Sequence, residues 1–305
     1  MNPLKQLQNL YLGLRYTLPL WIDRKTTPPL IRTLNHRLFH RNFPKRVKMV
    51  MRMYEIACGY SFDIQNPQTL NEKIQWLKLF HPDPLMTQCA DKYRVRDYIR
   101  ETIGEQYLAP LLGVFDHPNE IDFSALPDQF ALKVNWGSGQ NYICKNRAEL
   151  DVRECRRTLR KWLKPQNNQF FFGLEWAYRD IQPKIVCEEY LEFLEKDHKT
   201  FQFFCFNGEP RVVQVLTDVK TPNIKADLFD LDWNWLPINK GVPNSPLPLQ
   251  KPEGWELMVE LATRLCKPFP FVRVDLFLNE SQSFSTSLPF TQGVGWTCSI
   301  RRNGA

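Results

Sequence analysis

The sequence predicts an α+β protein in which a helical region precedes a body of largely antiparallel strands. Three observations lead to this fold class. Helical apolar spacing dominates the first hundred residues, tight-turn sequences join two pairs of apolar runs, and a further helix and strand follow. The 305 residues are 43% hydrophobic and 13% aromatic, a composition typical of a globular protein with about two domains.

Two helices are predicted ahead of the strands. Apolar residues recur at helical spacing in Leu70–Phe80, and Thr69 and Glu72 form the T-x-x-E capping box that marks a helix start. Residues 91–103 form the second helix, with an aspartate as its first residue. Residues 110–127 are expected to be connecting structure.

The strands are predicted after residue 125. One pair flanks a glycine-bearing turn at residues 137–139, which we call the glycine turn. Another pair, 201–206 and 211–216, flanks Asn207-Gly208, which is a strong hairpin signal. The remaining elements are a charged helix at 149–163, a strand at 183–193, a strand and turn at 228–237, a helix at Trp255–Cys266 and a strand at 271–278.

The positive charge is concentrated at the N-terminus. Residues 1–60 hold eleven Lys and Arg against two acidic residues, a balance of +9, whereas the whole chain carries +7. Residues 29–53 mix bases and apolar residues at the spacing of an amphipathic helix. Such a helix could hold the protein on an anionic membrane surface or steer an acidic polymer towards the site. The alternative is an ordinary helix whose apolar face packs on the body of the protein, which is compatible with either role. No nucleic-acid reading motif accompanies the bases, so nucleic acid is not an expected partner.

The first 25 residues lack a clean signal peptide, because Arg15 interrupts the apolar stretch and no small-residue cleavage site follows. No apolar run is long enough to cross a bilayer. The expected location is therefore the cytoplasm, with peripheral contact at the inner face of the membrane.

The glycine turn and its flanks are the first candidate site. Lys133 leaves the strand before the turn, and Lys145 leaves the strand after it. The turn residues Gly137, Ser138 and Gly139 offer backbone N–H groups that no large side chain covers. Two lysines beside such a turn suit a polyphosphate, although a plain β-hairpin with surface lysines has the same pattern.

A second candidate lies in the segment FVRVDL. Because strand side chains repeat every two residues, Arg273 and Asp275 lie on the same face. A carboxylate beside an arginine suits Mg²⁺ together with phosphate oxygens. A structural ion pair is the alternative.

A third candidate is the segment Glu188, Glu189, Tyr190 and Leu191, which we call the hinge segment. It closes the apolar part of the strand at 183–193. Its backbone is placed to read an adenine, and its carboxylates to hold a ribose. The alternative is a strand end with two solvated glutamates.

Seven blocks of the sequence, in this order, resemble the TupA-like ATP-grasp family, which is named for teichuronopeptide biosynthesis. They lie within residues 61–279 and read LNEKIQWLK, ADKYRVRDYI, ALKVNWGSGQNYICK, EWAYRDIQPKIVCEEYL, FFCFNGEP, FDLDWN and PFPFVRVDL. The resemblance implies an ATP-grasp fold, in which two α+β subdomains clasp ATP. The implied parts are a basic helical segment at 1–60, a helical region at 61–125, the ATP-grasp lid at 126–190, the ATP-grasp core at 191–280 and a divergent tail at 281–305.

The resemblance also implies an activity. ATP-grasp enzymes usually phosphorylate a carboxylate with ATP and let an amine attack the acyl phosphate. The expected cofactors are ATP and Mg²⁺. The expected substrates are a cell-surface polysaccharide, or a precursor of it, that carries a carboxylate, and an amine or amino acid. One alternative is a glycosyltransferase of the same pathway, although the DxD spacing at 230–232 belongs to the FDLDWN block. The other is a non-catalytic ATP-binding protein.

Position by position, the resemblance implies a role for each candidate residue. Lys133 would hold the α- and β-phosphates, with Lys92 as a second phosphate-binding lysine and the glycine turn closing over them. The hinge segment would contact the adenine side. Arg273 would steady the phosphoryl group in flight, and Asp275 would ligate Mg²⁺.

Two substitutions depart from the family pattern within the resembling blocks. Trp136 precedes the glycine turn, where the family usually has His. Thr200, Phe201 and Gln202 stand where the family usually has an acidic residue, an aromatic residue and a lysine. The second change removes one cation from the expected cleft.

The largest departure is the tail. The family continues after VDL to a strand that resembles FGELTFTPGSG, whose glutamate completes the metal site, and this chain lacks that glutamate. A shifted reading frame takes the last base of each codon and the first two bases of the next. Across residues 284–298, codons shifted in this way can encode FNELTFYPGGGLDV. We therefore expect that residues 281–305 are a shifted reading of the family's metal strand. The alternative is a divergent tail, and sequencing the gene decides between them.

Overall fold

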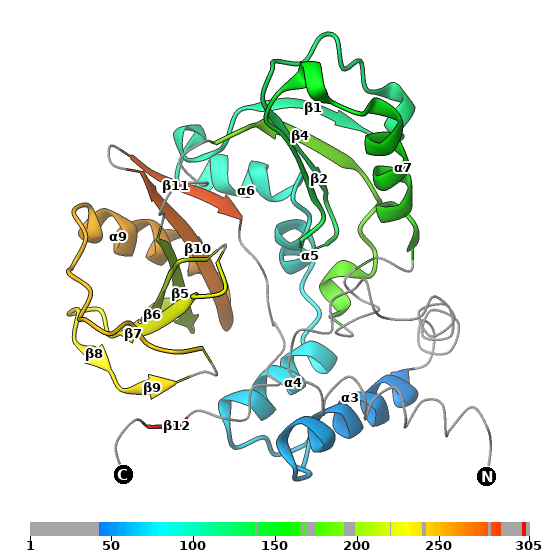
Figure 1. Ribbon diagram of the computed structural model, residues 1–305. Helices are drawn as coiled ribbons and strands as arrows, with labels where there is room; N and C mark the ends of the chain where they lie inside the picture. The colour runs from blue at the N-terminus through cyan, green and yellow to red at the C-terminus, as the bar shows by residue number, and fades with distance from the viewer. Residues whose placement is uncertain are drawn as a thin grey trace.

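The computed structural model describes residues 43–137, 139–165, 168, 175–191, 199–219, 221–239, 242–279, 282–287 and 301–302. The described residues form two antiparallel sheets with helices packed around them (Figure 1). The predicted α+β class is confirmed. The 3₁₀ turns of the described segments lie at Glu105–Tyr107 (η1), Pro118–Glu120 (η2), Arg147–Glu149 (η3) and Trp176–Tyr178 (η5).

Among the described residues, the helices before the first strand are α3 (Phe43–Cys58), α4 (Leu70–Phe80), α5 (Pro84–Ala90) and α6 (Val95–Thr102). The predicted capping box of α4 is confirmed, because Thr69 Oγ1 accepts from the Glu72 N–H and the Glu72 carboxylate accepts from the Thr69 N–H. The predicted start of the next helix was wrong by four residues. Asp91 lies before α6, and its carboxylate accepts from backbone N–H groups instead of opening the helix.

The first sheet has the strand order β1-β4-β2-β3, and every neighbouring pair is antiparallel. Its strands are β1 (Leu111–Phe115), β2 (Phe130–Val134), β3 (Asn141–Cys144) and β4 (Ile185–Glu189). The helix α7 (Val152–Trp162) packs against the sheet through the buried Cys155 and Leu159. The expectation of connecting structure at 110–127 was wrong at β1, an edge strand that pairs with β4.

The second sheet has the strand order β11-β10-β5-β6-β7-β8. Its strands are β5 (Thr200–Phe206), β6 (Glu209–Thr217), β7 (Lys225–Phe229), β8 (Trp235–Leu236), β10 (Phe271–Asn279) and β11 (Gln282–Ser287). The helix α9 (Trp255–Cys266) begins and ends where the sequence predicts, and it contacts β5, β6 and β10. A separate short pair joins β9 (Ile238–Asn239) to β12 (Arg301–Arg302).

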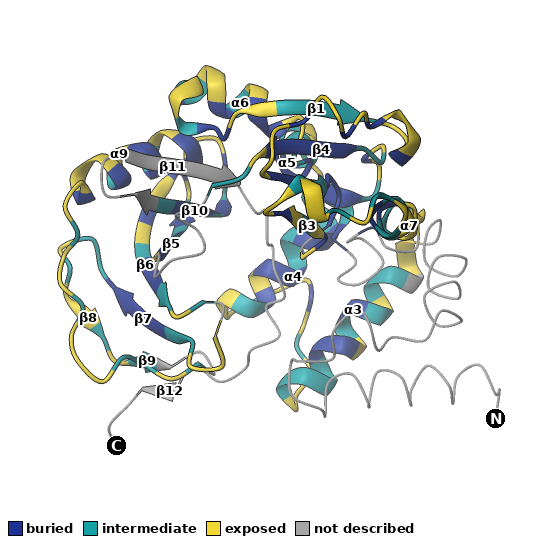
Figure 2. Ribbon diagram, turned by 45° about the horizontal axis from the view of Figure 1, so that its top comes forward, coloured by how far each residue is buried: buried dark blue, intermediate teal, exposed yellow. Residues whose placement is uncertain are grey.

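One hydrophobic core connects the two sheets. Its buried members include Val134 and Trp136 at the end of β2, Phe203 on β5, Trp255 on α9 and Val272 on β10. Figure 2 shows that β4 is buried along most of its length and lies beside β1. Since the end of β2 belongs to the same core as β5 and β10, the position of Lys133 is tied to the second sheet.

The predicted amphipathic helix at 29–53 is described from Phe43 onward, and the rest of that prediction lies outside the described residues. The apolar face of α3 packs on the body, since Val50 and Tyr54 are fully buried in a cluster with Ile64 and Leu79. Among the described residues, no helix is long and apolar enough to span a membrane.

The hairpin turn between β5 and β6 has the predicted left-handed backbone, with φ of 51° at Asn207 and 77° at Gly208. A Cβ at Gly208 would lie 2.6 Å from the backbone oxygen of Lys267. We expect Gly208→Ala to lower the free energy of unfolding by about 1–3 kcal/mol, as measured by urea denaturation. Gly59→Ala is the control, because Gly59 has φ of 76° but no atom within 4 Å of the added Cβ. Equal losses in the two variants would show that the contact with Lys267 contributes nothing.

Candidate functional site

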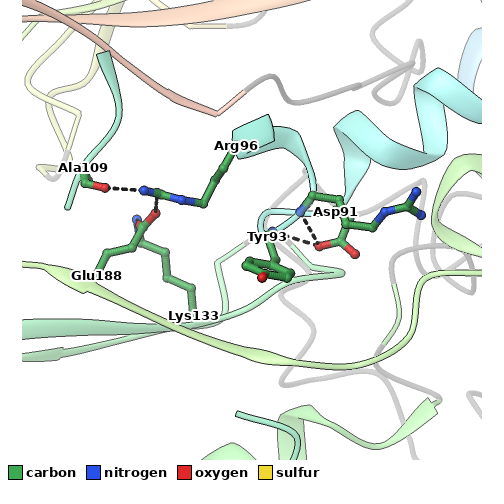
Figure 3. A network of polar contacts seen from close by, with 7 residues as sticks. Asp91, Tyr93, Arg96, Ala109, Lys133 and Glu188 are labelled. Carbon is green, nitrogen blue, oxygen red and sulfur yellow. Dashed lines mark hydrogen bonds and ion pairs between the residues drawn. The ribbon is translucent and has the colours of Figure 1, made fainter. Parts of the chain in front are cut away.

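A buried carboxylate with two cationic partners lies where β2, β4 and α6 meet. Glu188 Oε2 lies 2.5 Å from Lys133 Nζ, and Glu188 Oε1 lies 2.7 Å from Arg96 Nη1. Arg96 also donates from Nη2 to the backbone oxygen of Ala109 at 2.7 Å. Figure 3 shows Arg96 between Ala109 and Glu188, with Lys133 on the other side of the carboxylate. The register of the sheet explains this meeting, because β2 and β4 are adjacent strands.

The three charged groups differ in burial. The side chains of Arg96 and Glu188 are 6% and 8% exposed, whereas that of Lys133 is 21% exposed. An unpaired buried charge is costly, so Glu188 requires a partner in the core. Arg96 meets that requirement by itself. Lys133 is therefore a surplus cation at the edge of the site, and it can leave Glu188 without leaving the carboxylate unpaired.

The loop before α6 contacts the glycine turn. Lys92 Nζ donates to the backbone oxygen of Gly137, and the Lys92 N–H donates to the backbone oxygen of Asn135 at 3.1 Å. The structure thus brings Lys92 to the turn that follows Lys133, as the resemblance implies. Gly139 has φ of 71°, and no described atom lies within 4 Å of an added Cβ. Ser138 lies outside the described residues.

Asn135 and Asp91 hold this loop in place. Asn135 Nδ2 donates to the backbone oxygen of Gln182 at 2.9 Å, and Asn135 Oδ1 accepts from the Lys184 N–H at 2.8 Å. Asp91 Oδ1 accepts from the Tyr93 N–H at 2.8 Å. Burial raises the pKa of Asp91 above its usual value, although the hydrogen bonds that its carboxylate accepts, the one from the Tyr93 N–H foremost, act in the opposite direction. The contacts fix the backbone that carries Lys92.

Lys145 is not brought to the glycine turn. In the hairpin, Lys133 pairs with Asn141 and Phe130 pairs with Cys144. Lys145 follows Cys144, so it lies four residues beyond the partner of Lys133, or about 13 Å along the strand. The two lysines therefore lie at opposite ends of the hairpin, because antiparallel strands run away from their shared turn.

The hinge segment has two different halves. Glu188 points inward to the cations, whereas Glu189 is exposed and its N–H donates to the backbone oxygen of Pro110 at 2.9 Å. Tyr190 and Leu191 are half-buried. The alternative of two solvated glutamates is therefore wrong for Glu188, which is buried, and holds for Glu189 alone.

The pair on β10 is a close ion pair. Arg273 Nε and Nη2 donate to the two carboxylate oxygens of Asp275 at 2.6 and 2.7 Å. Burial raises the pKa of Asp275, and the adjacent guanidinium opposes that effect. Burial also acts to lower the pKa of Arg273, but the Asp275 carboxylate outweighs it, so the pKa of Arg273 is raised. The predicted shared face is confirmed, and the arginine and aspartate neutralise each other across it.

The two substituted positions have structural roles. Gln202 Nε2 donates to Asp275 Oδ2 at 3.4 Å, so an amide contacts the carboxylate where the family usually has a lysine. Trp136 is buried in the core, and its Nε1 donates to the backbone oxygen of Trp162 at 3.4 Å. Neither side chain supplies a charge.

A magnesium ion in a protein needs several oxygen ligands. No group of three or more His, Cys, Asp or Glu side chains that could hold a metal ion occurs in the described part of the chain. Asp275, the residue that the resemblance assigns to the metal, has both oxygens in contact with Arg273. The described residues therefore do not form a complete magnesium site.

Sequence reasoning missed Arg96, which is as buried as Glu188 and lies 92 positions before it. A charged residue on a short amphipathic helix is usually solvent-exposed, and nothing in the local sequence indicates that this one is buried. The block ADKYRVRDYI contains it, but the resemblance assigns a role to Lys92 alone.

Comparison with known proteins gives a family and a set of related structures. The TupA-like ATP-grasp family model matches residues 72–302. No curated protein matches the chain. The solved structures that are similar to it include a D-alanine–D-alanine ligase from Bacillus anthracis complexed with ATP (12% identity, TM-score 0.37, 67% of this chain and 55% of that chain), the D-cycloserine synthetase DcsG (13%, 0.38, 89% and 74%) and an L-amino acid ligase from Bacillus licheniformis (12%, 0.43, 85% and 56%).

The matched part of this chain thus spans little more than half of the first and third of these structures. Because all three TM-scores are below 0.5, the assignment depends on the family model. That model covers well over half of the 305 residues and includes the glycine turn, the hinge segment and β10. The chain belongs to the TupA-like ATP-grasp family.

Proposed function

We propose that this protein is an ATP-dependent carboxylate–amine ligase that acts in cell-surface polysaccharide biosynthesis. Membership of the ATP-grasp family supports the use of ATP. The observation that carries the proposal is the surplus cation Lys133, which shares Glu188 with the buried Arg96. Since Arg96 keeps Glu188 neutralised, Lys133 is available to a phosphate at a small cost in free energy.

In this proposal each residue of the site has one task. Lys133 turns from Glu188 to the nucleotide phosphates, and Lys92 exchanges the backbone oxygen of Gly137 for a phosphate oxygen. The backbone of the glycine turn lies against the phosphates. Bound ATP would supply the phosphoryl group that converts the substrate carboxylate into an acyl phosphate, with ADP as the other product. The amine would then attack the acyl carbon, form the amide and displace inorganic phosphate. Arg273 keeps Asp275 on its Nε and Nη2 groups and contacts the transferred phosphoryl group through Nη1. Because the described residues do not complete a magnesium site, no step is assigned to the metal.

Nucleotide binding tests the role of Lys133. We expect Lys133→Met to weaken ATP binding by at least about tenfold, measured by isothermal titration calorimetry, because it removes one charge-assisted phosphate contact. Lys184→Met is the matched control. Lys184 is also a partly exposed lysine, it lies directly before β4, and it is paired with Asp116 at 2.6 Å. Equal ATP affinity of wild type and Lys133→Met would contradict the assignment.

Product analysis tests the class of reaction. A ligase releases ADP when it is given ATP, a carboxylate and an amine, and it needs no sugar nucleotide. Sugar-nucleotide turnover without ADP release would instead identify a glycosyltransferase. ATP binding without turnover would identify a non-catalytic ATP-binding protein.

The proposal places the protein in the cytoplasm, with peripheral contact at the inner membrane face through residues 29–53. The bases in this region support it, and α3 keeps Lys48 and Arg52 exposed while its apolar face is packed. We expect charge reversal of the bases between residues 32 and 52 to reduce sedimentation with vesicles that contain anionic lipid. Unchanged sedimentation would remove the membrane from the proposal.

A further inference from the structure

A pocket of about 350 Å³ lies between α4 and one end of the second sheet. Figure 1 shows α4 beside the end of β10 where that strand begins. The walls are largely apolar and include Leu70 and Trp76 from α4, Phe206 from β5 and Phe271 from β10. This volume is at the small end of the range for ligand sites, which is about 300–1,000 Å³, and it suits one ring-sized unit. We call it the α4 pocket.

The α4 pocket continues the sheet face that carries the ion pair on β10. Phe271, Arg273 and Asp275 alternate along β10, so their side chains lie on one face. The same face receives Phe206, which is paired with Phe271 across the strands with ring centroids 5.2 Å apart. Two residues along a strand span about 7 Å, so Phe271, the nearest aromatic residue of the pocket wall, lies about 7 Å along β10 from Arg273. A substrate that reacts at Arg273 can extend directly into the pocket.

The pocket has few polar lining residues, and none of those described is negatively charged. Lys73 is the one charged residue among the described residues that line it, and it makes no ion pair with any described residue. The side-chain amide of Asn207 is also exposed at the pocket. No described lining residue is acidic, so a cationic ligand would find no countercharge there.

From these features we propose that the α4 pocket binds one ring-bearing, negatively charged unit of the carboxylate substrate, next to the unit that reacts at Arg273. The aromatic walls suit the apolar face of a ring, and Lys73 suits a carboxylate. A free amine donor does not fit, because its ammonium group would be left unpaired beside Lys73. This inference rests on the proposed function, because only a ligase would make the bound unit part of a substrate. It assigns the pocket to the carboxylate reactant and not to the amine.

Two anionic probes and one cationic probe test the charge preference in the absence of ATP. Trigalacturonate represents a sugar acid, N-acetyl-L-phenylalanine represents an acylated amino acid, and L-phenylalaninamide carries the same ring with a positive charge. Isothermal titration calorimetry is expected to detect at least one of the anions and not the cation. The anion that binds distinguishes the two sources of the ring.

Two variants place the bound probe in the pocket. Lys73→Glu reverses the single charge, and Leu70→Trp fills the entrance from a position that is 39% exposed in the folded protein. We expect each to weaken the anion at least about tenfold, which corresponds to about 1.4 kcal/mol. Lys164→Glu is the matched control, because Lys164 is an exposed lysine beside the first sheet and its charge reversal is expected to leave binding unchanged. Far-ultraviolet circular dichroism confirms that each variant is folded.

The proposal is overturned if neither anion binds the wild type, if both variants bind as the wild type does, or if the cation binds equally well. ATP binding, measured on the same proteins, separates this result from the proposed function. Anion binding in the pocket without ATP binding would refute the ligase and leave the pocket. ATP binding without anion binding would refute the pocket alone.

Discussion

Arg96→Met is expected to lower the free energy of unfolding by about 3–5 kcal/mol, the cost of removing one partner from a buried ion pair. Glu188 would remain in the core with Lys133, which is more exposed and is a weaker source of neutralisation. The backbone oxygen of Ala109 would also lose its donor. Urea denaturation measures the change.

Arg100→Met is the matched control for this prediction. Arg100 lies on the same helix and also pairs with a carboxylate, but its side chain is 43% exposed, so we expect a much smaller loss of stability than in Arg96→Met. Arg96→Met combined with Glu188→Gln should recover part of the stability, because the second change removes the buried negative charge. A similar loss in the Arg96 and Arg100 variants would contradict the proposed role of burial.

The second large effect is expected from the tail. The strand β11 pairs with β10, and the register places Ser287 opposite Asp275. Replacing residues 285–298 by the shifted reading, FNELTFYPGGGLDV, puts its glutamate at position 287 without changing the chain length. Directly opposed positions of two strands place side chains on the same face, about 5 Å apart. We therefore expect two carboxylates to meet there, with a gain in Mn²⁺ binding and at least about a 100-fold gain in ADP release.

The control for the tail is the same replacement with Gln in place of its glutamate. This version repeats every other change of sequence, so any gain that depends on the carboxylate must be absent from it. If both versions release ADP at the rate of the unaltered chain, the shifted reading does not restore the metal strand. Manganese binding, followed by electron paramagnetic resonance, separates a missing metal from a missing substrate.

The elements that the sequence predicted well have local causes. Thr69 and Glu72 are three residues apart, Asn207 and Gly208 are adjacent, and Arg273 and Asp275 are separated by one residue. Each of these signals acts through the backbone geometry of its own segment, which a single sequence contains.

The features that the sequence did not predict depend on contacts between distant segments. The strand β1 has only five residues and lies at the edge of its sheet, so its sequence contains no long apolar run that would predict it. It forms a strand because it pairs with β4, which is distant in the sequence. The ion pair of Arg96 with Glu188 joins residues 92 positions apart. The wrong start of α6 has a similar cause, because the Asp91 carboxylate serves a turn that also contacts Asn135.

The pairing of Lys133 with Glu188 also has a consequence for anion discrimination. A chloride or sulfate ion that approaches Lys133 must compete with a carboxylate that is already in contact, 2.5 Å away. Lys92 is similarly engaged by the backbone of Gly137. A ligand gains enough to displace both contacts when it presents several negative groups at once, as a chain of phosphates does. We therefore expect the resting protein to bind simple anions only weakly at Lys133 and Lys92.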